Sequence, residues 1–99
     1  MDIKTYNAFC ETLAHTSHVV QWGGSHVWKV DGKVFAIAGD DKQGGFRCSF
    51  KVSELAFDIL KEQPGCQGAP HLASRGMKWI QRFSEEAVDD EALKDYLLE

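Results

Sequence analysis

The segment QWGGSHVWKVDGKVFAIA, residues 21–38, determines the centre of the fold. Two short apolar runs in it flank the pair Asp31-Gly32. Asp-Gly supplies the positive φ angles that a tight primed turn needs, and the flanking Val, Trp, Phe and Ile side chains suit a pleated, half-buried surface. We therefore predict a β-hairpin with strands over 26–30 and 34–38. The segment offers no nucleophile, no phosphate loop and no set of metal ligands.

Apolar spacing and capping residues predict three helices. The first follows Asp2 and ends near Ala14, the second follows Ser53 and covers 54–63, and the third follows Asp89, which precedes an acidic first turn. The inward side chains are expected to be Leu55, Ala56, Ile59 and Leu60 in the second helix and Leu93, Tyr96 and Leu97 in the third. Because the apolar face of the third helix continues up to Glu99, we expect that a few more helical residues belong to this helix.

Further strands are predicted over 19–22, 46–51 and 77–83, which gives a sheet of about five strands. The polar residues 15–18 are expected to form a connection, the glycine- and aspartate-rich residues 39–45 a mobile turn, and residues 66–76 an ordered loop. Helix, sheet, helix, sheet and helix in this order predict the α+β class.

Length and composition predict a single domain over residues 1–99. The chain has 99 residues, of which 43% are hydrophobic, and it contains three tryptophans, which is typical of a folded globule. No apolar run reaches the length of a membrane span and no leader is visible, so a soluble, cytoplasmic protein is expected. Cys10, Cys48 and Cys66 form no CxxC pair, and we expect all three to be buried packing residues.

Alternation along the predicted strands suggests a basic sheet face. Side chains two residues apart share a face, so five cations could lie together opposite Trp28 and Trp79, namely Lys29, Arg47, Lys51, Lys78 and Arg82. Residues 29–83 carry nine basic and six acidic side chains, whereas the whole chain has a net charge of −4. Lys and Arg on one face fit phosphate contacts. They equally fit a solvated sheet face, because a pI of about 5.5 is far from that of a basic nucleic-acid binder.

Other chemical patterns are weaker. His15 and His18 have the i, i+3 spacing of a helical metal site, but they fall in a predicted connection without a suitably spaced carboxylate or cysteine. No GxSxG, HExxH or P-loop sequence occurs. We therefore expect no catalytic residues, no metal and no cofactor.

The order of motifs resembles the MmcQ/YjbR family of small bacterial proteins. The resemblance spans nearly the whole chain. It rests on Trp22-Gly23, the hairpin WKVDGKVFAIAG, the strand FRCSFKV leading into Ser53-Glu54, the segment APHLASRGMKWIQ and the acidic start of the last helix. It implies a frataxin-like, two-layer α/β sandwich with the helices on one face of an antiparallel sheet. Gly32, Lys33, Lys51 and Trp79 match family positions.

The resemblance also implies a "double wing" type of DNA binding. We accordingly expect a non-enzymatic monomer that binds double-stranded DNA, not membranes. The expected phosphate contacts are Lys29, Lys33, Arg47, Lys51, Arg75, Lys78 and Arg82. The alternative is a protein-interaction or small-ligand module that uses the Trp22-Gly23-Gly24 corner and the loop 68–76. A third reading, iron handling by analogy with the frataxin fold, would have to use the acidic residues 85–91.

Overall fold

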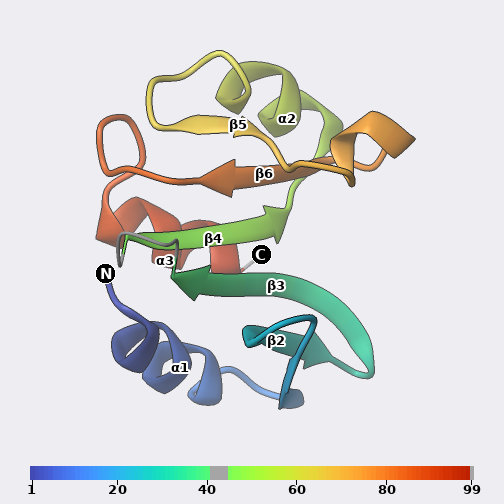
Figure 1. Cartoon of the computed structure of the whole chain (residues 1–99), viewed down its shortest axis with the longest axis vertical. Helices are drawn as coiled ribbons and strands as arrows, with labels where there is room; N and C mark the ends of the chain where they lie inside the picture. Colours follow the sequence, from blue (N-terminus) through green and yellow to red (C-terminus); the bar gives the residue numbers. More distant parts are fainter. Residues whose placement is uncertain (41–44, 99) are drawn as a thin grey trace.

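A computed structural model describes residues 1–40 and 45–98 (Figure 1). Along the chain, its elements are α1 (Ile3–Glu11), β1 (Thr16–Gln21), β2 (Ser25–Val30), β3 (Lys33–Asp40), β4 (Phe46–Lys51), α2 (Glu54–Leu60), β5 (Cys66–Gly68), a short 3₁₀ helix η1 (Ala73–Arg75), β6 (Trp79–Arg82) and α3 (Asp90–Leu98). Of the predicted turn over 39–45, Gly39 and Asp40 extend β3, and residues 41–44 lie outside the described residues.

The strands form one antiparallel sheet in the order β1-β2-β3-β4-β6-β5. The predicted hairpin between β2 and β3 is confirmed. Asp31 and Gly32 at its turn have φ angles of 49° and 80°, as a primed turn requires. The register between these strands shifts after Trp28, where Ala36 pairs with Trp28 and Val34 with Lys29. Phe35 is therefore left over as a β-bulge.

The three predicted helix caps are confirmed. Asp2 accepts a hydrogen bond from the Thr5 amide at 2.8 Å, Ser53 from the Ala56 amide at 3.2 Å and Asp89 from the Ala92 amide at 2.9 Å. These bonds satisfy amides that a helix leaves without partners in its first turn.

The helices and the sheet bury a common apolar core. Helical side chains in it are Tyr6, Cys10, Leu60, Leu93 and Leu97, and strand side chains are Trp28, Ala36, Ala38, Cys48, Phe50 and Ile80. Cross-strand pairs put Ala36 opposite Phe50 and Phe50 opposite Ile80, so these strand residues share one face of the sheet. The predicted two-layer α+β architecture, with the helices packed against an antiparallel sheet, is therefore correct.

Several predicted boundaries are wrong. α1 ends at Glu11 and not near Ala14, and β6 covers Trp79–Arg82 and not 77–83. β1 begins at Thr16, three residues before the predicted start. The prediction missed these residues because an edge strand exposed on both sides lacks apolar alternation. β5 is a sixth strand within the predicted loop 66–76, and its three residues are too few to show a pattern. α2 ends at Leu60 and exposes Leu55 by 72% and Ile59 by 53%, contrary to the inward orientation that we predicted. Leu60 is the buried residue of α2 and packs in the core.

The predicted facing of β6 is also wrong. Arg82 pairs with Cys48 and Ile80 with Phe50, so both lie on the helical side, whereas Trp79 pairs with Lys51 on the other side. Trp79 and Ile80 are adjacent and both buried, so apolar character in this strand does not alternate. Trp28 and Trp79 are both buried as expected, but on opposite faces. Trp22, in the β1–β2 turn, is 63% exposed.

All three cysteines are buried, which confirms the packing role that we predicted. Burial raises the pKa of the Cys10 thiol to about 12 and also raises the pKa values of Cys48 and Cys66. A buried thiol with a raised pKa is a poor nucleophile. No helix within residues 1–40 and 45–98 is long and apolar enough to cross a membrane.

Candidate nucleic-acid interface

Most of the predicted phosphate contacts lie at one end of the sheet. β2 ends, β3 begins, β4 ends and β6 begins at this end, because neighbouring strands are antiparallel. Lys29 lies near the end of β2 and Lys33 directly follows the Asp31-Gly32 turn. Lys51 is the last residue of β4. The hairpin thus brings two cations to the same sheet end as Lys51.

The segment before β6 adds two more cations. The Val52 amide donates to the Lys78 carbonyl at 3.0 Å, so Lys78 lies beside the end of β4. Its Nζ lies 4.9 Å from the centre of the Phe57 ring in α2, a cation–π contact. Arg75 ends η1 three residues earlier and is exposed. The chain therefore carries five of the seven predicted residues to one place.

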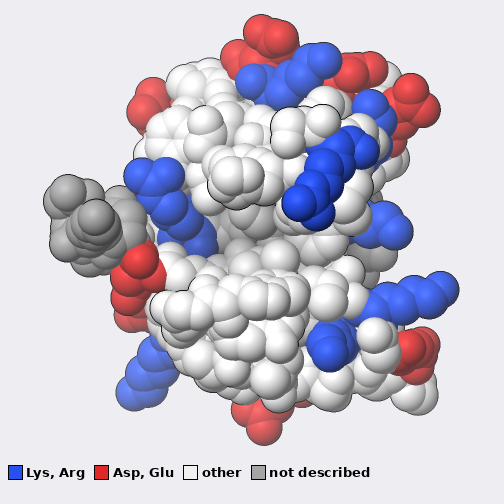
Figure 2. All heavy atoms as spheres, turned by 45° about the vertical axis from the view of Figure 1, so that its right-hand side comes forward, with Lys and Arg blue, Asp and Glu red and all other residues white. Residues whose placement is uncertain are grey.

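We call these five residues, Lys29, Lys33, Lys51, Arg75 and Lys78, the basic end. Figure 2 shows Lys and Arg side chains along this side of the molecule, next to a hollow. Hydrogen-bonded strands lie about 4.8 Å apart, so the cations are distributed over three strand spacings. Two acidic residues, Asp31 in the turn and Glu54 at the start of α2, lie at the same end and weaken the local positive potential.

Arg47 lies at the opposite end of the sheet, at the start of β4. Its Nη1 donates to Gln81 Oε1 at 3.4 Å, and its guanidinium lies 5.8 Å from the centre of the Phe83 ring. Gln81 also accepts from Gln67 at 2.7 Å. Arg47 is therefore separated from the basic end by the length of the strand.

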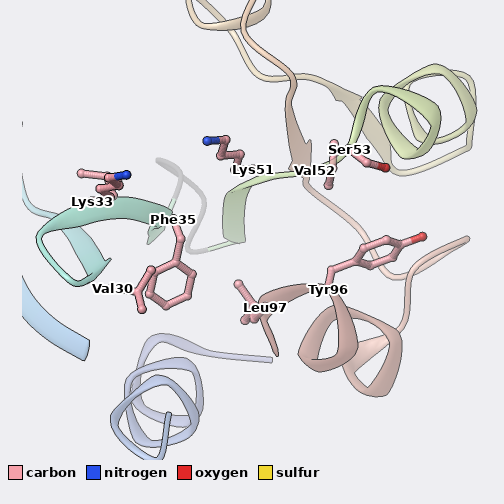
Figure 3. A pocket seen from close by; sticks show the side chains of 9 residues that line it. Val30, Lys33, Phe35, Lys51, Val52, Ser53, Tyr96 and Leu97 are labelled. Atoms are coloured by element: carbon pink, nitrogen blue, oxygen red, sulfur yellow. The ribbon is translucent and has the colours of Figure 1, made fainter. Parts of the chain in front are cut away.

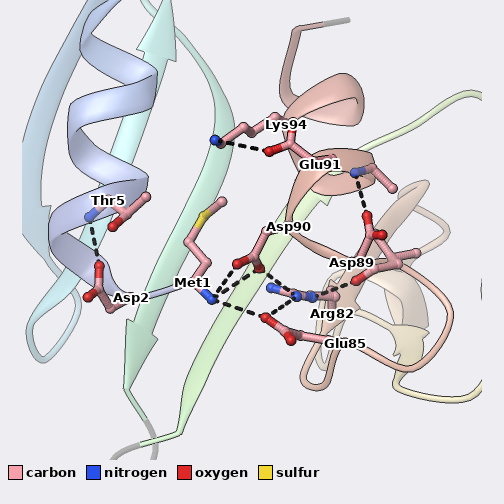
Figure 4. A network of polar contacts seen from close by, with 11 residues as sticks. Met1, Asp2, Thr5, Arg82, Glu85, Asp89, Asp90, Glu91 and Lys94 are labelled. Carbon is pink, nitrogen blue, oxygen red and sulfur yellow. Dashed lines mark hydrogen bonds and ion pairs between the residues drawn. The ribbon is translucent and has the colours of Figure 1, made fainter.

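Arg82 is not part of any open basic face, contrary to the prediction. Its side chain is 2% exposed, its Nε donates to the Val88 carbonyl at 2.9 Å and its Nη2 to Asp90 at 2.9 Å (Figure 4). A guanidinium in this environment is a structural group that ties β6 to the start of α3. The alternation of residue types along the strand placed Arg82 on the wrong face, because the sequence does not distinguish a buried, paired arginine from an exposed one.

Comparison with known proteins identifies a family for this chain. A family model described as YjbR matches residues 11–99. The chain belongs to the YjbR family. A search of curated proteins finds no match. The match includes the hairpin, β4, β6 and α3, so the basic end lies entirely within the matched part of the chain.

Acidic residues of this YjbR chain surround Arg82 and the amino terminus. The Met1 ammonium donates to Glu85 at 3.2 Å and to Asp90 at 3.0 Å (Figure 4).

Burial by itself lowers the pKa of the Met1 ammonium, but its contacts with Glu85 and Asp90 outweigh the effect of burial and the pKa is raised. Burial likewise raises the pKa of Asp90, but its bonds to the ammonium and to Arg82 lower it overall. The ammonium's contribution to stability is lost as the pH rises through its raised pKa, and the carboxylate's contribution as the pH falls through its lowered pKa. The network is therefore strongest between the ordinary values of 3.8 and 8.0.

The structure separates the two parts of the alternative interaction site. The Trp22-Gly23-Gly24 corner joins the edge strand β1 to β2, whereas the loop after Gly68 follows β5 at the other edge, so the two cannot form one site. Within the described parts of the chain, no three His, Cys, Asp or Glu side chains are grouped so as to hold a metal ion.

The YjbR chain also contains a histidine pair that sequence spacing missed. His18 in β1 and His26 in β2 lie with ring nitrogens 3.1 Å apart. Trp28 donates to Asn7 Oδ1 at 2.9 Å, which leaves the Asn7 amide nitrogen to donate to His26 Nδ1 at 3.2 Å. Asn7 therefore donates to His26 Nδ1, and His18 Nε2 lies against the same nitrogen. Antiparallel pairing of β1 with β2 creates this contact between residues eight positions apart.

Acidification is expected to weaken this histidine network. Burial first, and then the neighbouring His26, lower the pKa of His18, so its neutral form is favoured in the folded state. The resulting stability is present above about pH 6.5 and is lost as the pH falls toward the lower folded pKa. From pH 7.5 to 5.5 the wild type should lose up to about 1 kcal/mol more than His18→Gln, a small effect because solvent screens the exposed ring.

Urea unfolding at several pH values measures this difference. His71→Asn is the matched control, because it removes an exposed histidine at a positive φ of 70° that Asn tolerates. It should keep the pH dependence of the wild type. Parallel stability curves for the wild type and His18→Gln would contradict the assignment.

Proposed function

We propose that this YjbR-family chain is a non-enzymatic, cytoplasmic DNA-binding module that contacts duplex phosphates through the basic end. The observation that carries the proposal is the convergence of Lys29, Lys33, Lys51, Arg75 and Lys78 on one end of the sheet, from three strands and η1. Lys33 directly follows a tight hairpin turn. The hairpin would act as a wing, with Lys33 near its tip contacting the phosphate backbone of the duplex.

The charges of the molecule suit weak, salt-dependent binding. The overall charge of −4 disfavours approach to DNA, and Asp31 and Glu54 lie among the cations. Lysines contact phosphates without reading bases, so the proposed binding has little sequence preference. A monomer presenting this one end to the duplex is sufficient for these contacts.

The proposal is tested by the salt dependence of binding. A fluorescently labelled duplex of about 20 base pairs is titrated with the protein at several salt concentrations, and anisotropy gives the affinity. Four to five phosphate contacts predict a slope of about −4 in a plot of log K against log salt. Each Lys→Gln change at the basic end, as in Lys33→Gln, Lys51→Gln or Lys78→Gln, should reduce the magnitude of the slope by about 0.9.

Lys94 provides a matched control. It lies on α3 and pairs with Glu91 at 3.6 Å. Lys94→Gln removes the same charge but lies outside the basic end, so it should leave the slope unchanged. Absence of binding at low salt, or equal effects of Lys94→Gln and the variants at the basic end, would refute the proposal.

A further inference from the structure

A cavity opens where β3 and β4 stop pairing. Their ladder ends at the pair Ala36 and Phe50, although β3 begins three residues earlier at Lys33 and β4 continues to Lys51. The cavity between these two strand ends, which do not pair with each other, has a volume of about 540 Å³, within the range of small-molecule sites. It is lined by Val30, Lys33, Val34, Phe35, Lys51, Val52, Ser53, Tyr96 and Leu97.

Two cations face each other across the mouth of this cavity. In Figure 3 the side chains of Lys33 and Lys51 extend from β3 and β4 with their nitrogen ends turned toward one another. Both lysines are exposed, and neither forms an ion pair with another of the described residues. No Asp or Glu is among the described residues that line the cavity. An anion placed between these two like charges would be bound by both.

The cavity beneath the lysines is largely apolar and continues along the surface toward the ends of α1 and α3. Val30, Phe35 and Leu97 lie below the mouth (Figure 3). The same three residues also line a second hollow of about 270 Å³, which continues to Leu13, Ala14 and Leu98 between the ends of α1 and α3. The two hollows together form an apolar path that starts at a cationic mouth.

We infer that this path binds an elongated amphipathic anion, with a carboxylate between Lys33 and Lys51 and an unbranched alkyl tail along Phe35 and Leu97. The lysines recognise the charge of the head, and the apolar walls favour the tail because burial removes it from water. The bulge at Phe35 turns this ring toward the cavity side of the sheet end, which makes the wall continuous. The inference is independent of DNA binding, since it concerns the space below the two lysines.

Octanoate is the probe for this site. It is titrated into the full chain without DNA while amide and methyl NMR shifts are recorded. We expect shifts concentrated at Val30, Phe35 and Leu97 and not at Arg47 and Phe83, which lie at the opposite end of the sheet. Affinity should rise about fourfold with each methylene from hexanoate to octanoate, because each buried methylene adds a constant increment. The neutral 1-octanol should bind about tenfold more weakly.

Two double variants separate this site from a general charge effect. Lys33→Gln with Lys51→Gln should weaken octanoate binding about tenfold or more, whereas Lys29→Gln with Lys78→Gln removes two neighbouring charges outside the cavity lining and should leave it unchanged. Both pairs should weaken DNA binding similarly, so failure of one proposal is distinguishable from failure of the other. Val30→Trp, which fills the cavity and keeps both lysines, should abolish only octanoate binding.

Three results would overturn the inference: no dependence of affinity on chain length, equal binding of 1-octanol, or equal losses in the two double variants. Shifts confined to other surfaces would do the same, because they would show that octanoate binds elsewhere.

Discussion

Replacing Arg82 with methionine is expected to lower the free energy of unfolding by about 3 kcal/mol, with a fall in Tm of roughly 15 °C. Arg82 is 2% exposed and joins three groups, namely the Val88 carbonyl, Asp90 and Glu85. Methionine retains much of the apolar length but leaves the carbonyl without its donor. It also removes one of the two cations that Glu85 and Asp90 share, so that only the Met1 ammonium remains. Thermal and urea unfolding measure the loss.

Arg75→Met is the matched control for this experiment. Arg75 is exposed in η1, so the same substitution there should change the free energy of unfolding by no more than about 0.5 kcal/mol. Arg82→Lys should lie between the two, since an ammonium keeps the charge but cannot donate in the two directions of the guanidinium. If the free energies of unfolding of Arg82→Met and Arg75→Met differ by less than about 1 kcal/mol, which is about the spread of ordinary substitutions, the network contributes little to stability.

Gly65→Ala is expected to cost about 3 kcal/mol, for two reasons that add. Gly65 has a φ of +82°, where an L side chain is strained by about 1–2 kcal/mol. An added Cβ would also lie 2.8 Å from the Ser84 carbonyl oxygen and against the Ser84 hydroxyl. The chain cannot move away freely, because the Gly65 carbonyl accepts from the amides of Phe83 at 2.8 Å and Ser84 at 3.3 Å. Overpacking of this kind adds about 1–3 kcal/mol.

Gly32→Ala separates the two causes. Gly32 has nearly the same φ of +80°, but an added Cβ there would meet nothing within 4 Å. Its cost should therefore be only the backbone term of about 1–2 kcal/mol. The difference between the two variants in urea unfolding gives the cost of the contact with Ser84. Equal losses would mean that Ser84 and Gly65 separate without penalty.

Local signals predicted much of the fold correctly. The Asp31-Gly32 turn, the caps at Asp2, Ser53 and Asp89, and the strand over 46–51 each depend on neighbouring residues only, so the sequence reveals them. The elements that it missed have no local signature. β1 is polar and exposed, and β5 has three residues. α2 exposes Leu55 and Ile59 although both are apolar.

The candidate site was predictable in composition but not in arrangement. The basic middle of the chain and Lys33 beside the hairpin turn are visible in the sequence. Arg82 was misplaced because its facing depends on the register with β4, where it pairs with Cys48. The cavity was not predictable at all, since it exists only because the β3–β4 ladder stops at Ala36 and Phe50 and the end of α3 lies beneath the gap.

Consecutive residues are therefore enough to specify the hairpin, the helix starts, the α+β class and the resemblance to the YjbR family, because turns, caps and motif order are local properties. Three-dimensional packing is needed to establish which cations share a surface, which arginine is buried and where a cavity opens. Those outcomes depend on strand register and on the contacts of α1 and α3 with the sheet, which join residues far apart in the chain. The β2–β3 hairpin illustrates both cases. Its turn is predictable from Asp31 and Gly32 alone, whereas the position of Lys51 across the cavity from Lys33 is known only from the fold.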